Sequence, residues 1–258
     1  MTQIIAIAAH KGGVGKTTTA ISLSAALARS GASSLLVDLD PQGHSTIGLG
    51  VTCDENRTVW DILADRPVAL ETVTYPTSVP QLHVVPATIR LERQARTLLG
   101  RSFREHILRT ALERAGDAFD WVLIDCPPSL GTLVENALVA ANRVIVPCRS
   151  EARGADGLID LLEVLDLVNP VALDACQILR TQRHGARSTA NELLELALEP
   201  FRNRVLSTVV PQCDDLNHAQ VKGVDIFGYA PRSTGAAAYA QLAGEVRRAW
   251  GAGANSRS

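Results

Sequence analysis

Short apolar runs recur along the chain, and the stretches between them show a helical spacing of apolar residues. Runs of this kind are typical of strands that are buried on both faces of a sheet. We expect strands at Ile4–Ala9, Ser34–Leu39, Leu82–Val85, Trp121–Ile124, Val144–Pro147, Gln177–Leu179 and Val205–Val209.

The stretches between these runs predict helices. Ala20, Leu23 and Leu27 follow an i, i+3, i+7 spacing. A wider apolar stripe is formed by Leu158, Leu161, Leu162, Leu165 and Val168. Because buried strands alternate with helices, we predict an α/β fold with a mostly parallel, twisted sheet of about seven or eight strands and helices on both faces. Ligands of such sheets bind at the carboxyl ends of the strands.

Two further segments complete the predicted organisation. Residues 88–116 carry many arginines on a helical pattern that breaks near Gly100, which is typical of a solvated helix face. A last helix from Tyr239 to Trp250 is expected to dock on the core rather than anchor the chain in a membrane. We expect one domain over residues 1–250, followed by a flexible tail at 251–258.

Composition narrows the class of protein. Hydrophobic residues make up 46% of the 258, yet no uncharged apolar run approaches the roughly 20 residues that cross a bilayer. The first residues lack a basic region and a cleavage site, so we expect a cytoplasmic protein. The net charge of −2 argues against a nucleic-acid-binding protein that is cationic as a whole. Widely spaced cysteines argue against a disulfide framework or a zinc site: Cys53, Cys126, Cys148, Cys176 and Cys213.

The most informative segment is glycine-rich and runs from His10 to Thr18, directly after the first apolar run and before a helical stretch. A glycine-rich turn can point several backbone N–H groups inward, and the helix N-terminus adds partial positive charge. We expect Lys16 to reach the outer phosphates of a bound nucleotide and the Thr17 hydroxyl to ligate Mg²⁺. The alternative, a turn without a ligand, leaves the many matched positions unexplained. The candidate nucleotide-binding residues here are Lys11, Gly12, Gly13, Val14, Gly15, Lys16, Thr17 and Thr18.

Lysine is rare elsewhere in the chain, since Lys11, Lys16 and Lys222 are the lysines among 25 basic residues. The loop KGGVGKTT, with its early lysine, resembles the deviant Walker A box of the ParA/MinD group of ATPases, and the chain is most similar to the short, Soj-like ParA proteins. The resemblance implies a P-loop NTPase-like fold with ATP and Mg²⁺ as cofactors. It also implies a homodimer that forms on ATP binding, in which Lys11 reaches the nucleotide of the partner.

Two acidic segments follow strand ends. Asp38 and Asp40 lie in LLVDLDPQG, and Asp125 ends the run in WVLIDCPPS. Carboxylates beside a phosphate loop can orient water or support Mg²⁺. By resemblance, Asp40 would position the attacking water with support from Asp38, and Asp125 would be the Walker B acid. The candidate catalytic residues are therefore Lys11, Lys16, Asp40 and Asp125, and the candidate metal ligands are Thr17, Asp40 and Asp125. Taken alone, an acidic turn or a strand that ends in aspartate is also compatible with a purely structural role.

Base recognition is assigned by resemblance. Pro211, Gln212 and Cys213 match the segment whose backbone contacts adenine in the family, although Pro-Arg-Asn is frequent there. Val146–Glu151 is similar to the family's P-x-Q-x-E loop, with Arg149 where glutamine is usual. We favour ATP over GTP because the chain has no Asn-Lys-x-Asp guanine box.

The resemblance implies non-specific DNA binding by the ATP dimer and slow hydrolysis stimulated by a ParB-like or other partner. Such a cycle partitions or positions plasmid, chromosome or protein cargo, and the protein would then be nucleoid-associated. Asp214 and Asp215 occupy a segment where the family is usually basic. A replacement DNA-binding patch could be built from Arg180, Arg183, Arg187, Arg202, Arg204, Arg247 and Arg248.

Two other functions remain open. The first is a nucleotide-switched scaffold or regulator that positions a protein assembly without touching DNA. The second is a MinD-like ATPase that cycles on membranes, but the ending EVRRAWGAGANSRS offers only a short basic and apolar segment, so we expect no membrane binding. Because the chain starts at its first strand, we expect no helix-turn-helix extension and no binding to a specific operator.

Overall fold

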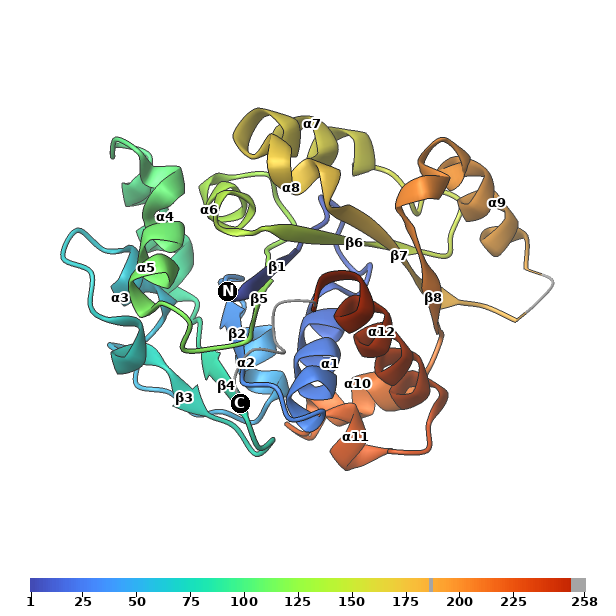
Figure 1. Ribbon diagram of the computed structural model, residues 1–258, viewed down its shortest axis with the longest axis horizontal. Coiled ribbons are helices and arrows are strands. Elements are labelled where there is room, and N and C mark those ends of the chain that lie inside the picture. The colour runs from blue at the N-terminus through green and yellow to red at the C-terminus, as the bar shows by residue number, and fades with distance from the viewer. Residues whose placement is uncertain (186–187, 252–258) are drawn as a thin grey trace.

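A single sheet of eight strands forms the centre of the computed structural model, which describes residues 1–185 and 188–251 (Figure 1). The strand order is β3-β4-β2-β5-β1-β6-β7-β8, and all neighbours are parallel except β3 and β4. The strands are β1 (Gln3–Ile7), β2 (Ser34–Asp38), β3 (Tyr75–Pro76), β4 (Leu82–Val85), β5 (Trp121–Asp125), β6 (Arg143–Arg149), β7 (Cys176–Arg183) and β8 (Val205–Pro211). The predicted mostly parallel α/β sheet is confirmed.

The seven expected strands are all present, with differences at their ends. β1 stops at Ile7, and the buried Ala8 and Ala9 begin the segment that leads to the glycine-rich loop. β7 continues past the apolar run to Arg183, because its polar residues pair with the neighbouring strands. β3 was not predicted, because it has two residues and shows no hydrophobic pattern. One of the two is Pro76, and proline in a sheet is typical of edge strands.

Helices cover both faces of the sheet (Figure 1). They are α1 (Lys16–Arg29), α2 (His44–Gly48), α3 (Val59–Leu63), α4 (Arg90–Leu98), α5 (Ile107–Ala115), α6 (Thr132–Ala140), α7 (Leu158–Val168), α8 (Pro170–Asp174), α9 (Thr189–Leu198), α10 (Asp214–Val221), α11 (Ile226–Tyr229) and α12 (Thr234–Trp250). Short 3₁₀ turns lie at Leu70–Val73, Arg104–His106 and Glu199–Arg204.

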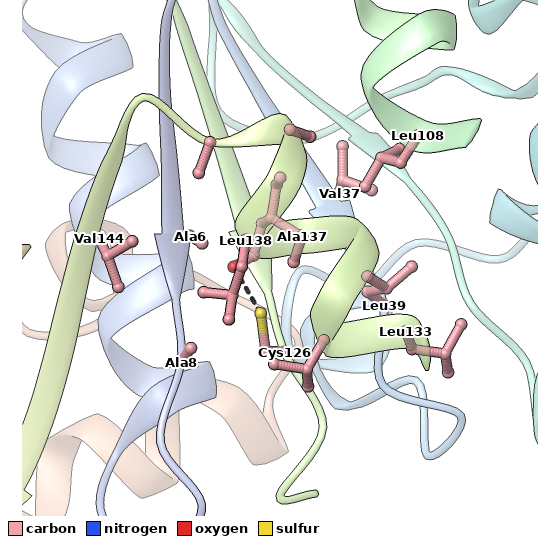
Figure 2. Packing of buried hydrophobic residues seen from close by; sticks show 14 of the residues in the cluster. Ala6, Ala8, Val37, Leu39, Leu108, Cys126, Leu133, Ala137, Leu138 and Val144 are labelled. Atoms are coloured by element: carbon pink, nitrogen blue, oxygen red, sulfur yellow. Dashed lines mark hydrogen bonds between the residues drawn. The ribbon is translucent and has the colours of Figure 1, made fainter. Parts of the chain in front are cut away.

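Alternate residues of a strand pack into two separate apolar cores, one on each face of the sheet. In β1, Ala6 packs in the core beneath α6 and α7, whereas Ile5 and Ile7 pack in the core beneath α1 and α12. This is the two-residue period of a strand with both faces covered. Figure 2 shows the first core, with Leu138 of α6 over β1 and Val144 of β6 beside it. A continuous apolar run is therefore what this position in the sheet requires.

The arginine-rich segment and the last helix follow the predictions. α4 and α5 are separate helices on either side of Gly100, and exposed pairs join Arg96 to Glu92 (3.9 Å) and Arg109 to Glu113 (2.8 Å). α12 buries Tyr239, Leu242 and Val246 in the core that it shares with α1.

The cysteines are free thiols, and Cys126, Cys148 and Cys176 are buried. Across residues 1–185 and 188–251, no helix has the length and apolar character that crossing a membrane requires. Most of the predicted tail, residues 252–258, lies outside the described part of the chain.

Candidate functional site

The glycine-rich segment forms a loop between β1 and α1 at the carboxyl edge of the sheet. Gly13 and Gly15 have φ angles of 72° and 92°, which residues with a side chain rarely adopt. Gly15 precedes the first turn of α1, and no side chain of the described residues caps that turn. Its N–H groups and the positive end of the helix dipole therefore suit an anion.

Lys16 begins α1 and is almost buried, with 7% of its surface exposed. Its Nζ donates to the backbone oxygen of Lys11 at 2.9 Å, which uses one of the three donors of an ammonium group. Burial lowers the pKa of Lys16, while the carboxylates of Asp125 and Asp40 act in the opposite direction. A buried ammonium group of this kind fits phosphate oxygens.

Asp125 ends β5 and is fully buried. Its Oδ2 accepts a hydrogen bond from Ser45 Oγ at 2.7 Å, whereas Oδ1 is buried without a hydrogen-bond partner among the described residues. Burial raises the pKa of Asp125 to about 6, although the hydroxyls of Ser45 and Thr17 and the Lys16 ammonium favour the ionised form. A buried carboxylate oxygen beside hydroxyls and an ammonium group fits a hydrated Mg²⁺.

Asp38 ends β2 directly opposite Asp125 in the register of the sheet. Its Oδ2 accepts hydrogen bonds from the Thr46 backbone N–H (2.8 Å) and hydroxyl (2.7 Å). Burial and the neighbouring Asp125 carboxylate raise the pKa of Asp38 to about 8. Asp38 thus holds α2 against the sheet and keeps the intervening turn in place.

Asp40 lies in that turn and is 8% exposed. Its Oδ1 accepts a hydrogen bond from the Gln42 backbone N–H at 3.0 Å. Gly43 closes the turn with a φ of 64°, and a Cβ there would lie 2.8 Å from the Ala87 carbonyl oxygen. The turn is therefore tightly built, and it brings Asp40 close enough to Lys16 to influence its pKa.

Lys11 makes its contacts within its own chain. Its Nζ lies 2.5 Å from Glu151 Oε1 and donates to the Arg153 carbonyl oxygen at 2.9 Å. Arg149, where the family usually has glutamine, lies 3.6 Å from the same carboxylate. Lys11 and Lys16 therefore belong to the same loop, but their ammonium groups lie in different environments.

The remaining predicted nucleotide residues lie along the same edge. The Thr18 hydroxyl accepts a hydrogen bond from Gln220 of α10 at 2.9 Å. Pro211 ends β8, and Gln212 and Cys213 lead into α10. The Gln212 backbone N–H donates to the Arg183 carbonyl oxygen at 2.9 Å, which ties this segment to the end of β7.

Several residues that contact the site were not identified from the sequence. Besides Ser45, Thr46 and Gln220, they include two residues of β7. The Thr181 hydroxyl donates to the Val14 carbonyl oxygen at 2.8 Å, and the Gln182 amide donates to the Gly13 carbonyl oxygen at 2.9 Å. None belongs to a motif. For Thr181 and Gln182 the sequence does carry one signal: they follow a short apolar run, as polar residues at the carboxyl end of a strand do.

The predicted DNA-binding arginines occupy different settings. Arg180 and Arg183 bind Glu195 of α9 at 3.1 and 2.9 Å, and Arg204 donates to the Leu173 carbonyl oxygen. Arg202 pairs with Glu199 at 3.5 Å, and the exposed Arg247 and Arg248 lie at the end of α12. Arg187 lies outside the described residues.

Comparison with known proteins agrees with this geometry. A family model described as an AAA domain matches residues 2–177. The chain is 40% identical over 250 residues to the sporulation initiation inhibitor protein Soj of Bacillus subtilis, a match that covers 95% of this chain and 98% of that protein. The chain belongs to the ParA/MinD family, among its Soj-like members. The family assignment made from the KGGVGKTT loop is therefore confirmed.

Solved structures of related proteins show the same fold. A cobyrinic acid a,c-diamide synthase from Mycobacterium smegmatis, with bound ATP analog and magnesium, is 33% identical with a TM-score of 0.82, covering 98% of this chain and 97% of that one. The septum site-determining protein MinD of Pyrococcus horikoshii, complexed with Mg-ADP, is 27% identical with a TM-score of 0.79, covering 99% of this chain and all (100%) of that one. The predicted P-loop NTPase-like fold is thus confirmed.

Proposed function

We propose that this ParA-like ATPase closes around ATP as a sandwich dimer, binds DNA without sequence preference and hydrolyses ATP slowly to partition or position a plasmid, chromosome or protein cargo. The chain is an ATPase, with ATP and Mg²⁺ as its cofactors. One observation carries the proposal: Lys11 and Lys16 leave the same glycine-rich loop, and only Lys16 turns toward Asp40 and Asp125.

Each part of the site has a role in this reaction. The loop N–H groups and Lys16 bind the phosphates, and Thr17, Asp40 and Asp125 hold Mg²⁺ and its waters. Bound Mg²⁺ neutralises the charge that develops on the phosphates. Asp40 orients the attacking water, and the backbone of residues 211–213 contacts the base. Slow turnover follows, because the site relies on positioning and charge rather than on a strong general base.

The environment of Lys11 supports a dimer-dependent switch. In the single protomer its ammonium group is paired with Glu151 on the loop after β6. In the proposed dimer it exchanges this partner for the phosphates in the other subunit's site. Hydrolysis then depends on dimerisation, as it does for an arginine finger supplied in trans.

Lys11→Ala should bind a non-hydrolysable ATP analogue within about 3-fold of the wild type, because each protomer keeps its own Lys16. Its ATP-dependent dimer should be lost, and hydrolysis should fall by at least about 100-fold. Light scattering coupled to size-exclusion chromatography measures the dimer. Lys222→Ala, at the exposed end of α10, is the matched control. A Lys11→Ala protein that dimerises with ATP would refute the assigned role.

DNA binding is tested by filter retention of random-sequence duplex with ATP and with ADP. We expect retention in ATP that falls steeply between about 50 and 200 mM salt. The double variant Arg247→Ala and Arg248→Ala should reduce the slope against log salt by about 2. Arg96→Ala, an exposed arginine on the opposite face of the sheet, should leave the slope unchanged. Equal, weak retention in both nucleotides would exclude this part of the proposal.

A scaffold that switches with nucleotide and positions proteins without DNA is the second candidate. It is favoured by the internal contacts of Arg180, Arg183 and Arg204, and by Asp214 and Asp215 at the start of α10. Under either function a ParB-like or other protein would stimulate hydrolysis. A dimer that forms normally with ATP but does not retain DNA would favour the scaffold. Membrane cycling has no support in α12, because its apolar residues pack in the core.

A further inference from the structure

The end of β7 holds the phosphate loop through two consecutive side chains. Thr181 Oγ1 donates to the Val14 carbonyl oxygen at 2.8 Å, and Gln182 Nε2 donates to the Gly13 carbonyl oxygen at 2.9 Å. In a regular strand, consecutive side chains point to opposite faces of the sheet. Two neighbours that reach successive carbonyls of one loop therefore require a local departure from strand geometry.

That departure lies at Gln182. Its φ is 50°, in the left-handed region, and the pairing of β7 with β8 shifts register between Arg180 and Arg183. A bulge of this kind re-aims a side chain, and such bulges are frequent beside active sites. The left-handed conformation is unfavourable for a residue with a Cβ, and it persists where the surroundings over-determine it. Arg180 and Arg183 secure the segment by their shared pairing with Glu195.

The two hydrogen bonds set the direction of the loop's donors. The Gly13 carbonyl shares a planar peptide with the Val14 N–H, and the Val14 carbonyl shares one with the Gly15 N–H. In a trans peptide, C=O and N–H point in opposite directions. Since β7 binds both carbonyls, both N–H groups point away from β7. Successive N–H groups on one side of a glycine loop form a nest for an anion.

We propose that Gln182, together with Thr181, is a positioning residue that orients the Val14 and Gly15 N–H groups toward the phosphates of the nucleotide. This inference rests on the proposed nucleotide site. Gln182 touches the loop and not the reacting atoms, so its effect acts through the loop backbone. Its strained backbone is retained because a relaxed strand would aim the amide away from the Gly13 carbonyl oxygen.

Three variants test the proposal. Gln182→Met keeps the length of the side chain and loses the amide donor, and Gln182→Gly also relieves the left-handed backbone. Gln81→Met is the matched control, because Gln81 is an exposed residue with a φ of 66° that precedes β4, far from β7 in the strand order. The ligands are MgATP, MgADP and inorganic tripolyphosphate, which reports on the phosphate subsite without a base.

We expect both Gln182 variants to bind all three ligands about 3- to 10-fold more weakly, the equivalent of one hydrogen bond. KM should rise while kcat at saturation changes by less than about 2-fold, because the effect is on ground-state and transition-state binding alike. Gln182→Gly should also melt at an equal or higher temperature than the wild type without nucleotide. Higher thermal stability combined with weaker binding is a signature that a merely structural contact would not produce.

Unchanged tripolyphosphate affinity in Gln182→Met would overturn the proposal, as would equal losses in the Gln81 control. A loss of affinity that appears only together with a matching fall in melting temperature would also overturn the proposal. Wild-type protein that binds no ATP would instead refute the nucleotide site itself, so the two failures are distinguishable.

Discussion

Lys16→Ala should lower the affinity for MgATP by at least about 100-fold, because each charge-assisted hydrogen bond to a phosphate contributes about 1.5–3 kcal/mol. Lys16 is almost buried, and burial lowers the pKa of its ammonium group. A charge in that position contributes little to the nucleotide-free fold. Alanine is also a strong helix former in the first turn of α1. Binding should therefore be lost while the melting temperature without nucleotide stays close to that of the wild type.

Calorimetric titration with Mg²⁺ and a non-hydrolysable ATP analogue measures this loss, and circular dichroism follows the fold. Lys11→Ala is the internal control, since that lysine pairs with Glu151 and should leave binding within one protomer nearly intact. Equal losses in the two variants would contradict the separate roles of the two lysines. A Lys16→Ala protein that binds within about 5-fold of the wild type would contradict the phosphate contact itself.

Asp125→Asn should make the nucleotide-free protein more stable at pH about 8, by about 1–3 kcal/mol, and should lower Mg²⁺-dependent hydrolysis by at least about 100-fold. Folding raises the pKa of Asp125 from 3.8 to about 6, so the folded state binds more protons than the unfolded state between these values. The free energy of unfolding therefore falls as pH rises through this range. The same sign holds for Asp38, whose pKa rises to about 8.

Asparagine fits the position. Its side-chain oxygen can accept the Ser45 hydroxyl, and its NH₂ group replaces the Oδ1 that has no hydrogen-bond partner among the described residues. Removing this charge also removes the repulsion that Asp125 exerts on the Asp38 carboxylate. Urea denaturation without Mg²⁺ at pH about 5 and about 8 should show a loss of stability in the wild type and a smaller loss in the variant. Asp174→Asn, on the surface at the end of α8, is the control. A wild type that gains stability over this pH range would contradict the argument.

The central sheet was predictable because strands with both faces covered are apolar along most of their length, as in Leu35–Val37 and Trp121–Ile124. The glycine-rich loop and the acids near it were recognisable in the sequence for a related reason. Glycine at a left-handed position and a carboxylate at a strand end each have a local signature. Short edge strands lack one, and β3 was missed for that reason.

Contacts between distant segments were not predictable. Gln182 and Gly13 are 169 residues apart in sequence, and their hydrogen bond depends on a bulge that composition does not reveal. From the sequence, Arg180 and Arg183 are equally compatible with binding DNA and with pairing to Glu195, because the ion pairs form only once α9 packs against β7. Local chemistry indicated the candidate residues of the site, whereas their supporting side chains could be found only from the three-dimensional arrangement.

The placement of Asp38 and Asp125 side by side on neighbouring strands has a practical consequence for handling the protein. Two acids set side by side in a dry interior repel each other once both are ionised, and a divalent ion relieves that repulsion. Chelators in alkaline storage buffers would therefore lower the stability of the sheet where β2 and β5 meet. Digestion by a protease should be faster under those conditions, and adding magnesium back should slow it.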